Sequence, residues 1–377
     1  MISYSLIILF TILLINYFLF LQDVLKGLNN LKPCEEKVND EFVSVIVPFR
    51  NESENILASL KSLSGQNYPK NKFEIIFVND SSVDDSLQKL NLNNNHENVR
   101  VLSVPDDYNN NSNKKRAIQY GIENSNGEII VTTDADCFHS KNWLITLMKC
   151  MNEKTGFVSG PVEFIDGSNL FSKFQKLEFA GLVLTGAGLI GANKPAICNA
   201  ANIAYRKKLF NDVGGFNDKI KLSSGDDELL LQKIWKESDH DIKFCWNHNA
   251  IVKTSPNKTL KEFYHQRKRW ASKGIFYGSK KLVLKLILIY LFYVGLIIQL
   301  ALSVFISKIY IILFIISISL KFIMEFKVLK RGEKLISIKR IIKFFPIVEI
   351  LQIPYIIFAG FSGLFGNFNW KERKIKR

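Results

Sequence analysis

Long uncharged stretches near both ends of the chain restrict its fold more than any other feature of the sequence. Residues 2–22 contain no charge and are long enough to span a bilayer as a helix, and residues 286–307 form a second such stretch. A third apolar stretch covers residues 309–326, with Lys321 near one end, where a lysine stem can snorkel to the interface. The sequence therefore predicts an integral membrane protein whose polar middle part folds outside the bilayer.

A fourth apolar stretch, residues 344–366, is the weakest candidate span because it contains Glu349, Pro346 and Pro354. We expect it to be re-entrant or interfacial and packed against protein. The first stretch lacks a basic n-region and an Ala-x-Ala-like cleavage site, so we expect an uncleaved anchor rather than a signal peptide. The predicted organisation is an anchor at residues 1–25, a polar linker at 26–41, a folded polar domain at 42–280 and a membrane region with a basic tail at 281–377.

The net charge of +15 is concentrated beside the apolar stretches. Residues 253–285, 327–343 and 367–377 carry net charges of +9, +6 and +4, so the rest of the chain is acidic overall. The positive-inside rule and the attraction of anionic lipids place basic residues in this way. The pattern indicates a membrane protein and gives no nucleic-acid footprint. Lysines after the first stretch predict that the middle domain faces the cytoplasm at the cytoplasmic membrane: Lys26, Lys32 and Lys37.

The five cysteines show neither a CxxC pair nor a histidine partner at metal-binding spacing. An odd number without a framework is typical of reduced thiols in a cytosolic domain. We therefore expect all five to be reduced.

From residue 42 onward, short apolar runs alternate with helical patterns. Strands are predicted at 42–48, 73–78, 99–104 and 128–133, with helices at 54–63 and 114–123, while residues 156–252 look mixed, with a glycine-rich middle. Uninterrupted apolar strands that alternate with helices indicate an α/β fold with a Rossmann-like parallel sheet covered on both faces. Ligands bind beyond the carboxyl ends of such strands, and three polar clusters follow these ends: residues 48–52, 79–80 and 134–136.

Asp134 and Asp136 occupy alternate positions of the turn after the fourth predicted strand. Their carboxylates can face one divalent cation, and hard oxygen ligands suit Mg²⁺ or Mn²⁺, with a diphosphate completing the shell. The ion would neutralise the charge that builds on a departing nucleoside diphosphate. Aspartates are also frequent turn residues, so both interpretations stay open.

Asp80 and Asp227 each have two interpretations on local grounds. Asp80 ends the second predicted strand, where it could accept a hydrogen bond from uracil or ribose, or form an Asx-turn with the serines that follow. Asp227 could act as a general base that deprotonates an acceptor hydroxyl. Asp226 and Asp227 also precede an amphipathic helix predicted at 228–235, where acidic residues stabilise the first turn.

The segment Gln266-Arg-Lys-Arg-Trp270 lies just before the C-terminal apolar stretches. In a helix over residues 258–278, Gln266, Arg269 and Trp270 share one face. That face offers an amide, a cationic fork and a flat ring, which suit binding a pyrophosphate and stacking a sugar. Basic residues and tryptophan are also common where a helix meets a membrane surface. The acidic clusters that precede the segment favour the binding function.

In their order along the chain, these residues resemble the inverting, membrane-associated glycosyltransferase family 2, over about residues 42–280. Asp226 stands where the family usually has glutamate, and Asn113 stands where glycine often precedes Lys114. The Trp370-Lys-Glu-Arg373 ending resembles the tail of some members. The resemblance implies a GT-A type, Rossmann-like nucleotide-sugar fold. It rests on the segments 47–52 (VPFRNE), 77–82 (FVNDSS), 113–121 (NKxxAxxxG), 133–136 (TDAD), 199–206, 214–216, 225–227 (GDD) and the Q-x-x-R-W pattern at 266–270.

The resemblance also implies a role for each matching residue. Asp227 corresponds to the catalytic base, and Asp134 and Asp136 correspond to the metal ligands. The acceptor would be bound by Trp270 and Asp226. The donor nucleotide would be bound by Pro48, Arg50, Glu52, Asp80, Lys114, Asp134, Gln266 and Arg269.

The function implied is transfer of one sugar from a nucleotide-diphospho-sugar, expected to be a UDP-sugar, to a lipid or glycan hydroxyl at the cytoplasmic membrane face. One alternative is a processive polysaccharide synthase of the same family, for which the membrane part offers few helices unless the chain oligomerises. Another is a membrane-anchored nucleotidyltransferase. That class needs a loop rich in glycine, arginine and lysine after the first strand, where this chain has Pro48-Phe-Arg-Asn-Glu52.

Overall fold

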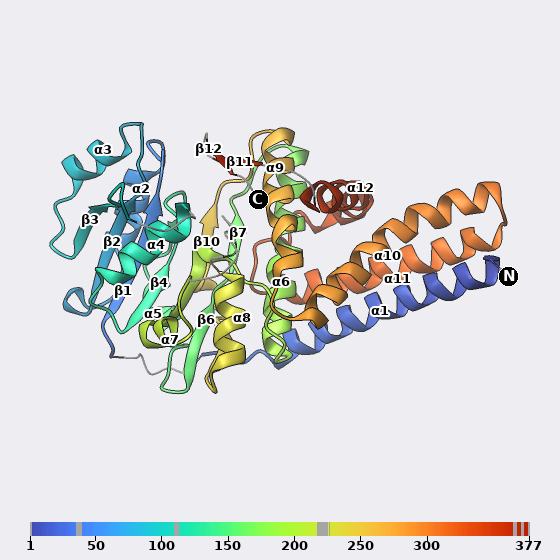
Figure 1. The fold of residues 1–377 in the computed structure, drawn as a ribbon, viewed down its shortest axis with the longest axis horizontal. Coiled ribbons are helices and arrows are strands. Elements are labelled where there is room, and N and C mark those ends of the chain that lie inside the picture. The colour runs from blue at the N-terminus through green and yellow to red at the C-terminus, as the bar shows by residue number, and fades with distance from the viewer. Residues whose placement is uncertain are drawn as a thin grey trace.

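The computed structural model describes residues 2–34, 40–108, 113–216, 225, 227–364, 368–370 and 373–375. A sheet with helices on both faces makes up one end of the molecule, and long apolar helices make up the other (Figure 1). Helix α6 (Leu170–Gly191) stands between these two parts. We call residues 43–276 the sheet domain.

The main sheet combines parallel and antiparallel strands. Its strands are β1 (Val43–Phe49), β2 (Phe73–Asn79), β3 (Val99–Ser103), β4 (Ile129–Thr132), β6 (Thr155–Ser159), β8 (Ile203–Arg206) and β9 (Asp241–Phe244). They lie in the order β3-β2-β1-β4-β8-β6-β9. The first four are parallel to one another, as the sequence predicts, and β8 runs antiparallel to both β4 and β6.

Successive residues of β1 face two different hydrophobic cores. Val45 and Val47 belong to a buried cluster that includes Ile56 of α2 (Ile56–Ser64). Ile46 belongs to a second cluster with Ile118 of α4 (Asn113–Glu123). Since apolar burial contributes about 25 cal/mol per Å², a strand that is apolar on both sides is stable only when helices cover both faces. The strand patterns therefore specify the layered fold.

The remaining elements of the sheet domain complete the frame around the strand ends. A small sheet joins β5 (Phe138–His139), β10 (Val252–Thr254) and β7 (Val162–Phe164). The helix predicted at 228–235 is α8 (Glu228–Glu237), and that predicted at 258–278 is α9 (Leu260–Lys273), which ends earlier than expected. The other helices are α3 (Ser86–Asn93), α5 (Trp143–Met148) and α7 (Lys207–Asp212).

The first apolar helix, α1 (Ile2–Asn30), continues into the segment expected to be a linker and packs against α6. Glycines allow the close contact, since a Cβ added to Gly27 would lie 1.7 Å from the carbonyl oxygen of Gly188. Val24 and Leu28 of α1 are fully buried in the same cluster as Leu184 of α6. The end of α1 is therefore part of the folded core.

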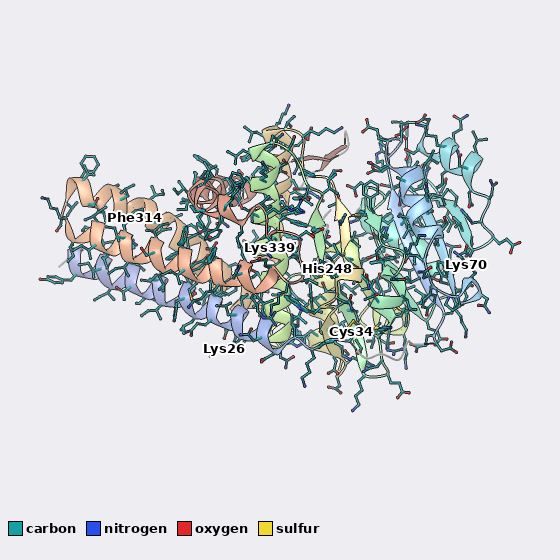
Figure 2. All side chains as sticks on the ribbon, turned by 180° about the vertical axis from the view of Figure 1, so that it is seen from behind. Lys26, Cys34, Lys70, His248, Phe314 and Lys339 are labelled. Atoms are coloured by element: carbon teal, nitrogen blue, oxygen red, sulfur yellow. A yellow bond between two sulfur atoms is a disulfide. The ribbon has the colours of Figure 1, made fainter. Side chains whose placement is uncertain are left out.

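Four helices of the described residues are long and apolar enough to cross a membrane. α1, α10 (Lys280–Phe305) and α11 (Ile309–Gly332) lie side by side, with the N-terminus and the α10–α11 turn far from the sheet (Figure 1). Figure 2 shows Phe314 on these helices and Lys26 near the end of α1 that adjoins the sheet domain. α12 (Phe345–Leu364) is seen end-on in Figure 1 and so runs across the others. This direction supports the expected interfacial placement, which stays a prediction.

Lys321 does not reach the membrane surface, so the expectation that it snorkels is wrong. Its side chain is fully buried, and its ammonium group lies 2.9 Å from Glu325 Oε1 and also pairs with Glu349 of α12. It donates a further hydrogen bond to Oε1 of Gln352, 3.1 Å away. A charge among apolar helices needs such partners because an unpaired one is costly there. Glu349, which weakens the fourth stretch as a span, is therefore a partner that holds α12 to α11.

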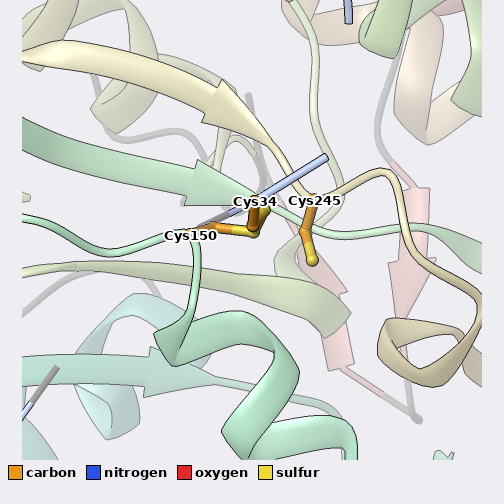
Figure 3. A group of neighbouring side chains, drawn as sticks. All are labelled: Cys34, Cys150 and Cys245. Atoms are coloured by element: carbon orange, nitrogen blue, oxygen red, sulfur yellow. A yellow bond between two sulfur atoms is a disulfide. The ribbon is translucent and has the colours of Figure 1, made fainter. Parts of the chain in front are cut away.

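The structure differs from the expectation of five reduced thiols, because it joins Cys34 to Cys150. These two residues form a disulfide, with their Cα atoms 4.7 Å apart, and Cys245 lies beside them (Figure 3). A separation of 116 residues hides such a pair from any spacing rule. The disulfide joins the segment after α1 to the chain just after α5.

Of the described residues that lie C-terminal to α12, two short strands pair as a hairpin. They are β11 (Phe368–Trp370) and β12 (Arg373–Ile375), and they form an antiparallel pair. β11 lies against α9.

Candidate active site

A large cleft of about 1110 Å³ runs from the carboxyl ends of β1, β2 and β4 to the apolar helices. Asp226 is the one candidate site residue that lies outside the described residues. The structure brings the others together from well-separated parts of the chain. The cleft is lined by Pro48, Arg50, Glu52, Asp80, Lys114, Asp134, Asp136, Asp227, Gln266, Arg269 and Trp270.

The loops that follow β1 and β2 are held to each other. Nη1 of Arg50 donates to the carbonyl oxygen of Asp80, at 2.9 Å, and to that of Ser81. The amide of Asn51 donates to Oγ of Ser82 at 3.1 Å. Asn51 and Ser81 have φ angles of 51° and 55°, a left-handed conformation that short polar residues adopt more readily than most. Arg50 thus shapes this wall through backbone contacts, and its expected role in donor binding stays a prediction.

Asp80 is almost fully buried at the end of β2, with Arg116 of α4 against it. Nη2 of Arg116 lies 3.3 Å from Oδ1 of Asp80. The sequence motifs do not include Arg116, which lies on α4, the same helix that carries Lys114 at the cleft. Glu52 bonds within its own loop, where Oε2 accepts from Nδ2 of Asn55 at 2.9 Å.

Asp134 and Asp136 lie at the turn after β4, on one wall of the cleft. Nζ of Lys114 lies 2.7 Å from Oδ1 of Asp134. Oδ2 of Asp136 accepts from Oγ1 of Thr254 at 3.5 Å. The turn is closed by the amide of Cys137, which donates to the carbonyl oxygen of Asp134 at 3.2 Å. The geometry therefore holds both carboxylates at the cleft beside a lysine that can bind phosphate oxygens.

This donor set fits a hard divalent cation. Carboxylate oxygens of Asp134 and Asp136 are the ligands that Mg²⁺ and Mn²⁺ prefer, and a bound diphosphate could supply the rest. Burial raises the pKa of the neighbouring Cys137 thiol well above its ordinary value, so this sulfur stays protonated and does not offer a competing thiolate.

Asp227 is both a helix cap and a cleft residue. Its Oδ1 accepts from the amide of Glu228 at 2.8 Å, which caps α8, and its Oδ2 accepts from the amide of Ala200 at 3.0 Å. The two interpretations of this residue from sequence therefore do not exclude each other. The cap fixes the carboxylate at the cleft wall, where it can meet a ligand.

Lys273, in the last turn of α9, lies between two carboxylates. Its Nζ is 2.9 Å from Oε2 of Glu228 and 3.7 Å from Oδ1 of Asp227. The hydroxyl of Tyr277 donates to the same oxygen of Glu228. All four side chains are buried, and burial raises the pKa of Glu228 from 4.5 to about 7, against the opposing charge of Lys273. No sequence motif identified Lys273, Glu228 or Tyr277.

The start of α9 is fixed by a capping box. Oγ1 of Thr259 accepts from the amide of Glu262 at 3.1 Å, and the Glu262 carboxylate accepts from the amide of Thr259 at 3.3 Å. This cap sets where the helix begins, and therefore which face of the segment 266–270 turns toward the cleft.

Within that segment the buried arginine is Arg267. Its Nε donates to Oε1 of Glu178 on α6 at 3.2 Å, and its Nη2 pairs with the other carboxylate oxygen. The guanidinium carbon lies 4.3 Å from the centre of the Trp270 ring, which also packs against Phe179. Arg267 therefore holds α9 to α6, and it lines the cleft together with Gln266 and Arg269. The partner Glu178 comes from a distant segment, so the motif alone could not reveal this contact.

The far end of the cleft lies between α10 and α12 and is mainly apolar. Its lining there comprises Val283, Leu286, Ile287, Ile289 and Tyr290 of α10, and Gln352, Tyr355, Ile356, Ala359 and Gly360 of α12.

Comparisons with known proteins place this cleft in a family context. The family model described as glycosyl transferase family 2 matches residues 44–214. The chain is 28% identical over 274 residues to the probable glycosyltransferase YdaM of Bacillus subtilis, with 72% of this chain and 61% of that protein covered. It is 26% identical over 245 residues to the poly-beta-1,6-N-acetyl-D-glucosamine synthase of Staphylococcus epidermidis, with 62% and 55% covered. The matched part of the chain thus spans less than two thirds of the length of these relatives.

A solved structure shows the same fold along nearly the whole chain. The mannosyltransferase PcManGT from Pyrobaculum calidifontis, in complex with GDP-Man and Mn²⁺, superposes with a TM-score of 0.62 at 17% sequence identity. The superposition covers 96% of this chain and 98% of that one. At this identity the similarity concerns the fold alone. The expected GT-A fold, with apolar helices at both ends of the chain, is confirmed.

Proposed function

We propose that this chain, whose residues 44–214 match the model of glycosyl transferase family 2, transfers one sugar, with inversion, from a UDP-sugar to a hydroxyl of a lipid or glycan at the cytoplasmic face of the membrane. One observation supports this above all. A single cleft combines Asp80, Asp134, Asp136 and Asp227 with the face of α9 that presents Gln266 and Arg269. The acids and the cationic helix face are what a nucleotide-sugar donor requires at its base, diphosphate and reacting carbon.

In this proposal Asp227 takes the proton from the acceptor hydroxyl as a general base. The acceptor oxygen attacks the anomeric carbon from the face opposite the diphosphate. The bond from that carbon to the diphosphate oxygen breaks, its electron pair leaves with UDP, and the sugar configuration inverts. Asp227 is held by the amides of Glu228 and Ala200, so its position needs no reorganisation during the reaction.

The remaining residues bind the two substrates. Lys114, Gln266 and Arg269 donate to the diphosphate, because cationic and amide N–H groups match phosphate oxygens. Asp80 accepts a hydrogen bond from the base or ribose. Pro48, Arg50 and Glu52 form the donor wall, and Trp270 contacts the acceptor, while Asp226, outside the described residues, is assigned to the acceptor from the sequence alone.

Asp134 and Asp136 would hold Mg²⁺ or Mn²⁺ in this proposal. The cation, when bound, neutralises charge on the departing diphosphate. Lys114, 2.7 Å from Asp134, keeps a protein cation at the same place.

Substitution of the base tests the proposal. Asp227→Asn keeps the cap oxygen but removes the base, so we expect kcat to fall by about 10²–10⁴-fold. The measurement is nucleotide release by the full-length protein in detergent, from a panel of UDP- and GDP-sugars. Asp239→Asn, an exposed site at the end of α8, is the matched control. Activity of Asp227→Asn within a few-fold of wild type would remove this residue as the base.

The products separate the two alternatives. A nucleotidyltransferase would release pyrophosphate from UTP, whereas the proposed enzyme releases UDP from a UDP-sugar. A processive synthase would yield a distribution of long polymers. We propose single addition, because a processive synthase needs a path for its polymer. Between α1, α10 and α11, a continuous buried cluster that includes Phe10, Phe292 and Met324 fills the space instead.

A further inference from the structure

We propose that the acceptor is a hydroxyl-bearing membrane lipid that enters the cleft sideways, between α10 and α12. This inference rests on the proposed function, and it names the substrate class of the same site. It also assigns Tyr290 and Gly360 as the two sides of the entrance.

The first argument is the change of polarity along the cleft. Asp134, Asp136 and Asp227 line one end, whereas Val283, Leu286 and Ile356 line the other. A glycan would have to leave its hydroxyl groups without partners against such aliphatic walls, which is unfavourable. A hydrocarbon chain meets no such cost and gains from the removal of apolar surface from water. The two ends together match a molecule with a polar head and an apolar tail.

The second argument is where the apolar end lies. The lining residues of α10, from Val283 to Tyr290, belong to the part of this helix nearest the sheet domain (Figure 1). Exposed Lys280 and Lys281 begin the same helix, as expected where a span enters an anionic membrane surface. α12 runs across the bundled helices at this level, with Phe358 66% and Phe361 60% exposed on it. The mouth between α10 and α12 therefore opens where lipid head groups meet lipid chains.

The third argument is the construction of the entrance. The hydroxyl of Tyr290 donates to the carbonyl oxygen of Ile357 on α12 at 3.2 Å. A Cβ added to Gly360 would lie 2.6 Å from the Tyr290 ring, so the ring rests directly on the glycine. Deeper in the cleft the hydroxyl of Tyr355 donates to Oε1 of Glu178 at 2.6 Å, which holds α12 to α6. The hydrogen bond from Tyr355 to Glu178 thus fixes α12 in place. The Tyr290 side chain, by contrast, can rotate away from α12 and open the entrance.

The choice of a hydroxyl over a phosphate head follows from the base. A phosphate acceptor is already ionised near neutral pH and needs no base, whereas a hydroxyl must lose a proton as it attacks. Asp227 is fixed at the cleft wall for that purpose in the proposed function. The expected acceptors are therefore lipids with a free alcohol, on glycerol or on a sugar already attached.

The experiment blocks the entrance with a bulky side chain and follows the transfer of a radiolabelled sugar. Full-length protein is placed in nanodiscs made from the total lipid extract of its source cells and given a radiolabelled sugar nucleotide. Wild type should transfer label into the organic phase. Gly360→Trp places an indole between α10 and α12, and we expect it to lower this transfer at least about tenfold while hydrolysis of the sugar nucleotide, in which water takes the place of the lipid hydroxyl, is kept. Phe358→Trp, on the exposed side of α12, is the matched control and should behave as wild type.

The outcomes separate the two proposals. Label found only in water-soluble glycan, or Gly360→Trp transfer to lipid equal to wild type, would overturn the lipid entrance and leave the glycosyltransferase intact. Label that mild acid releases from the lipid as free sugar, as expected of a glycosyl phosphodiester and not of a simple glycoside, would show a phosphate acceptor and overturn the hydroxyl assignment. Wild type that releases nucleotide from no sugar nucleotide would contradict the proposed function itself. Tyr290→Ala, which opens the same contact, should keep lipid transfer, so that its loss would also count against the entrance.

Discussion

Lys273 lies closer to the carboxylate of Glu228 than to that of Asp227, and the ionisation of Glu228 changes how it pairs with the two. Burial raises the pKa of Glu228 to about 7, so this group is neutral below that pH and ionised above it. When Glu228 is neutral, Asp227 is the only carboxylate of the two that attracts the ammonium group. When Glu228 ionises, it draws Lys273 toward itself, at 2.9 Å against 3.7 Å for Asp227. The carboxylate of Asp227, the proposed base, is then less strongly paired with Lys273.

We therefore expect kcat/KM to rise as pH increases through about 7. Glu228→Gln stays neutral at every pH, so it should lack this inflection and resemble the low-pH form, with several-fold lower activity at high pH. The sign for stability is opposite. A carboxyl with a raised pKa contributes stability that is full below its ordinary 4.5 and is lost as pH rises through about 7. Activity and thermal-unfolding profiles of both proteins between pH 5 and 9 check this, and an unchanged inflection in Glu228→Gln would exclude Glu228 as its source.

The two aspartates at the turn after β4 predict a second residue-scale result. Asp136→Asn should weaken Mn²⁺ binding by about tenfold or more, since even outer-shell partners of a metal are worth that much. Asp134 is a less clean test because its loss also removes the 2.7 Å partner of Lys114. The readout is the electron paramagnetic resonance of free Mn²⁺ titrated with protein and UDP. Chelation with EDTA should abolish turnover, and added Mn²⁺ or Mg²⁺ should restore it. Equal Mn²⁺ affinity in Asp136→Asn and wild type would argue against this site.

Local patterns predicted what depends on local sequence, and failed where a partner comes from far away. The four parallel strands and the polar ends of β1, β2 and β4 follow from apolar runs and turn residues, and the structure confirms them. The pairs Arg267–Glu178, Arg116–Asp80 and Cys34–Cys150 join segments that no spacing rule connects. The prediction for Lys321 is wrong because hydropathy counts only the free-energy cost of a lysine in lipid. It does not register the ion pair with Glu349 that offsets this cost. The roles assigned to the cleft residues stay predictions.

At the scale of elements, the glycine-rich segment of the sequence belongs to one long helix, α6. Its residues Gly188 and Gly191 lie against α1. Gly188 faces α1 so closely that the carbonyl oxygen of Gly188 would meet a Cβ at Gly27 at 1.7 Å. α6 in turn forms a wall of the cleft through Glu178 and Phe179. The first apolar helix, α1, is therefore part of the support of the site.

This contact predicts opposite effects for two glycine substitutions. Gly27→Ala must push α1 from α6, so we expect it to destabilise the protein by about 1–3 kcal/mol, the usual cost of overpacking. Gly181→Ala on α6 has open space around the new methyl group. It should be neutral or stabilise by up to about 1 kcal/mol, because alanine favours a helix over glycine. Thermal unfolding in detergent measures both, and a Gly27→Ala protein as stable as wild type would show that α1 is not docked there.

At the scale of the whole molecule, three bundled helices and one crossing helix set the topology. α1 and the α10–α11 turn reach the end far from the sheet, so the N-terminus lies on one side and the sheet domain on the other (Figure 1). α12 runs across the bundle near the sheet, and residues 368–370, which follow it, lie against α9 on the sheet side. The basic segments 253–285 and 327–343 then share that side, as the positive-inside rule requires of the cytoplasm. A reporter fused before Met1 should be extracytoplasmic, and one fused after Arg377 should be cytoplasmic.

The cysteine pair gives an independent test of this orientation. In the cytoplasm, glutathione and thioredoxin keep thiols reduced, whereas oxidising compartments preserve disulfides. The structure brings Cys34 and Cys150 into a disulfide, so the pair can form. With the sheet domain in the cytoplasm, we expect it to be reduced in cells and to form only on oxidation after lysis. Acid-trapped cells, denatured and alkylated with a mass-tagged maleimide, should show both cysteines modified, and Cys34→Ser should lose one tag. Full oxidation of the pair in acid-trapped cells would contradict the cytoplasmic placement, whatever the reporters show.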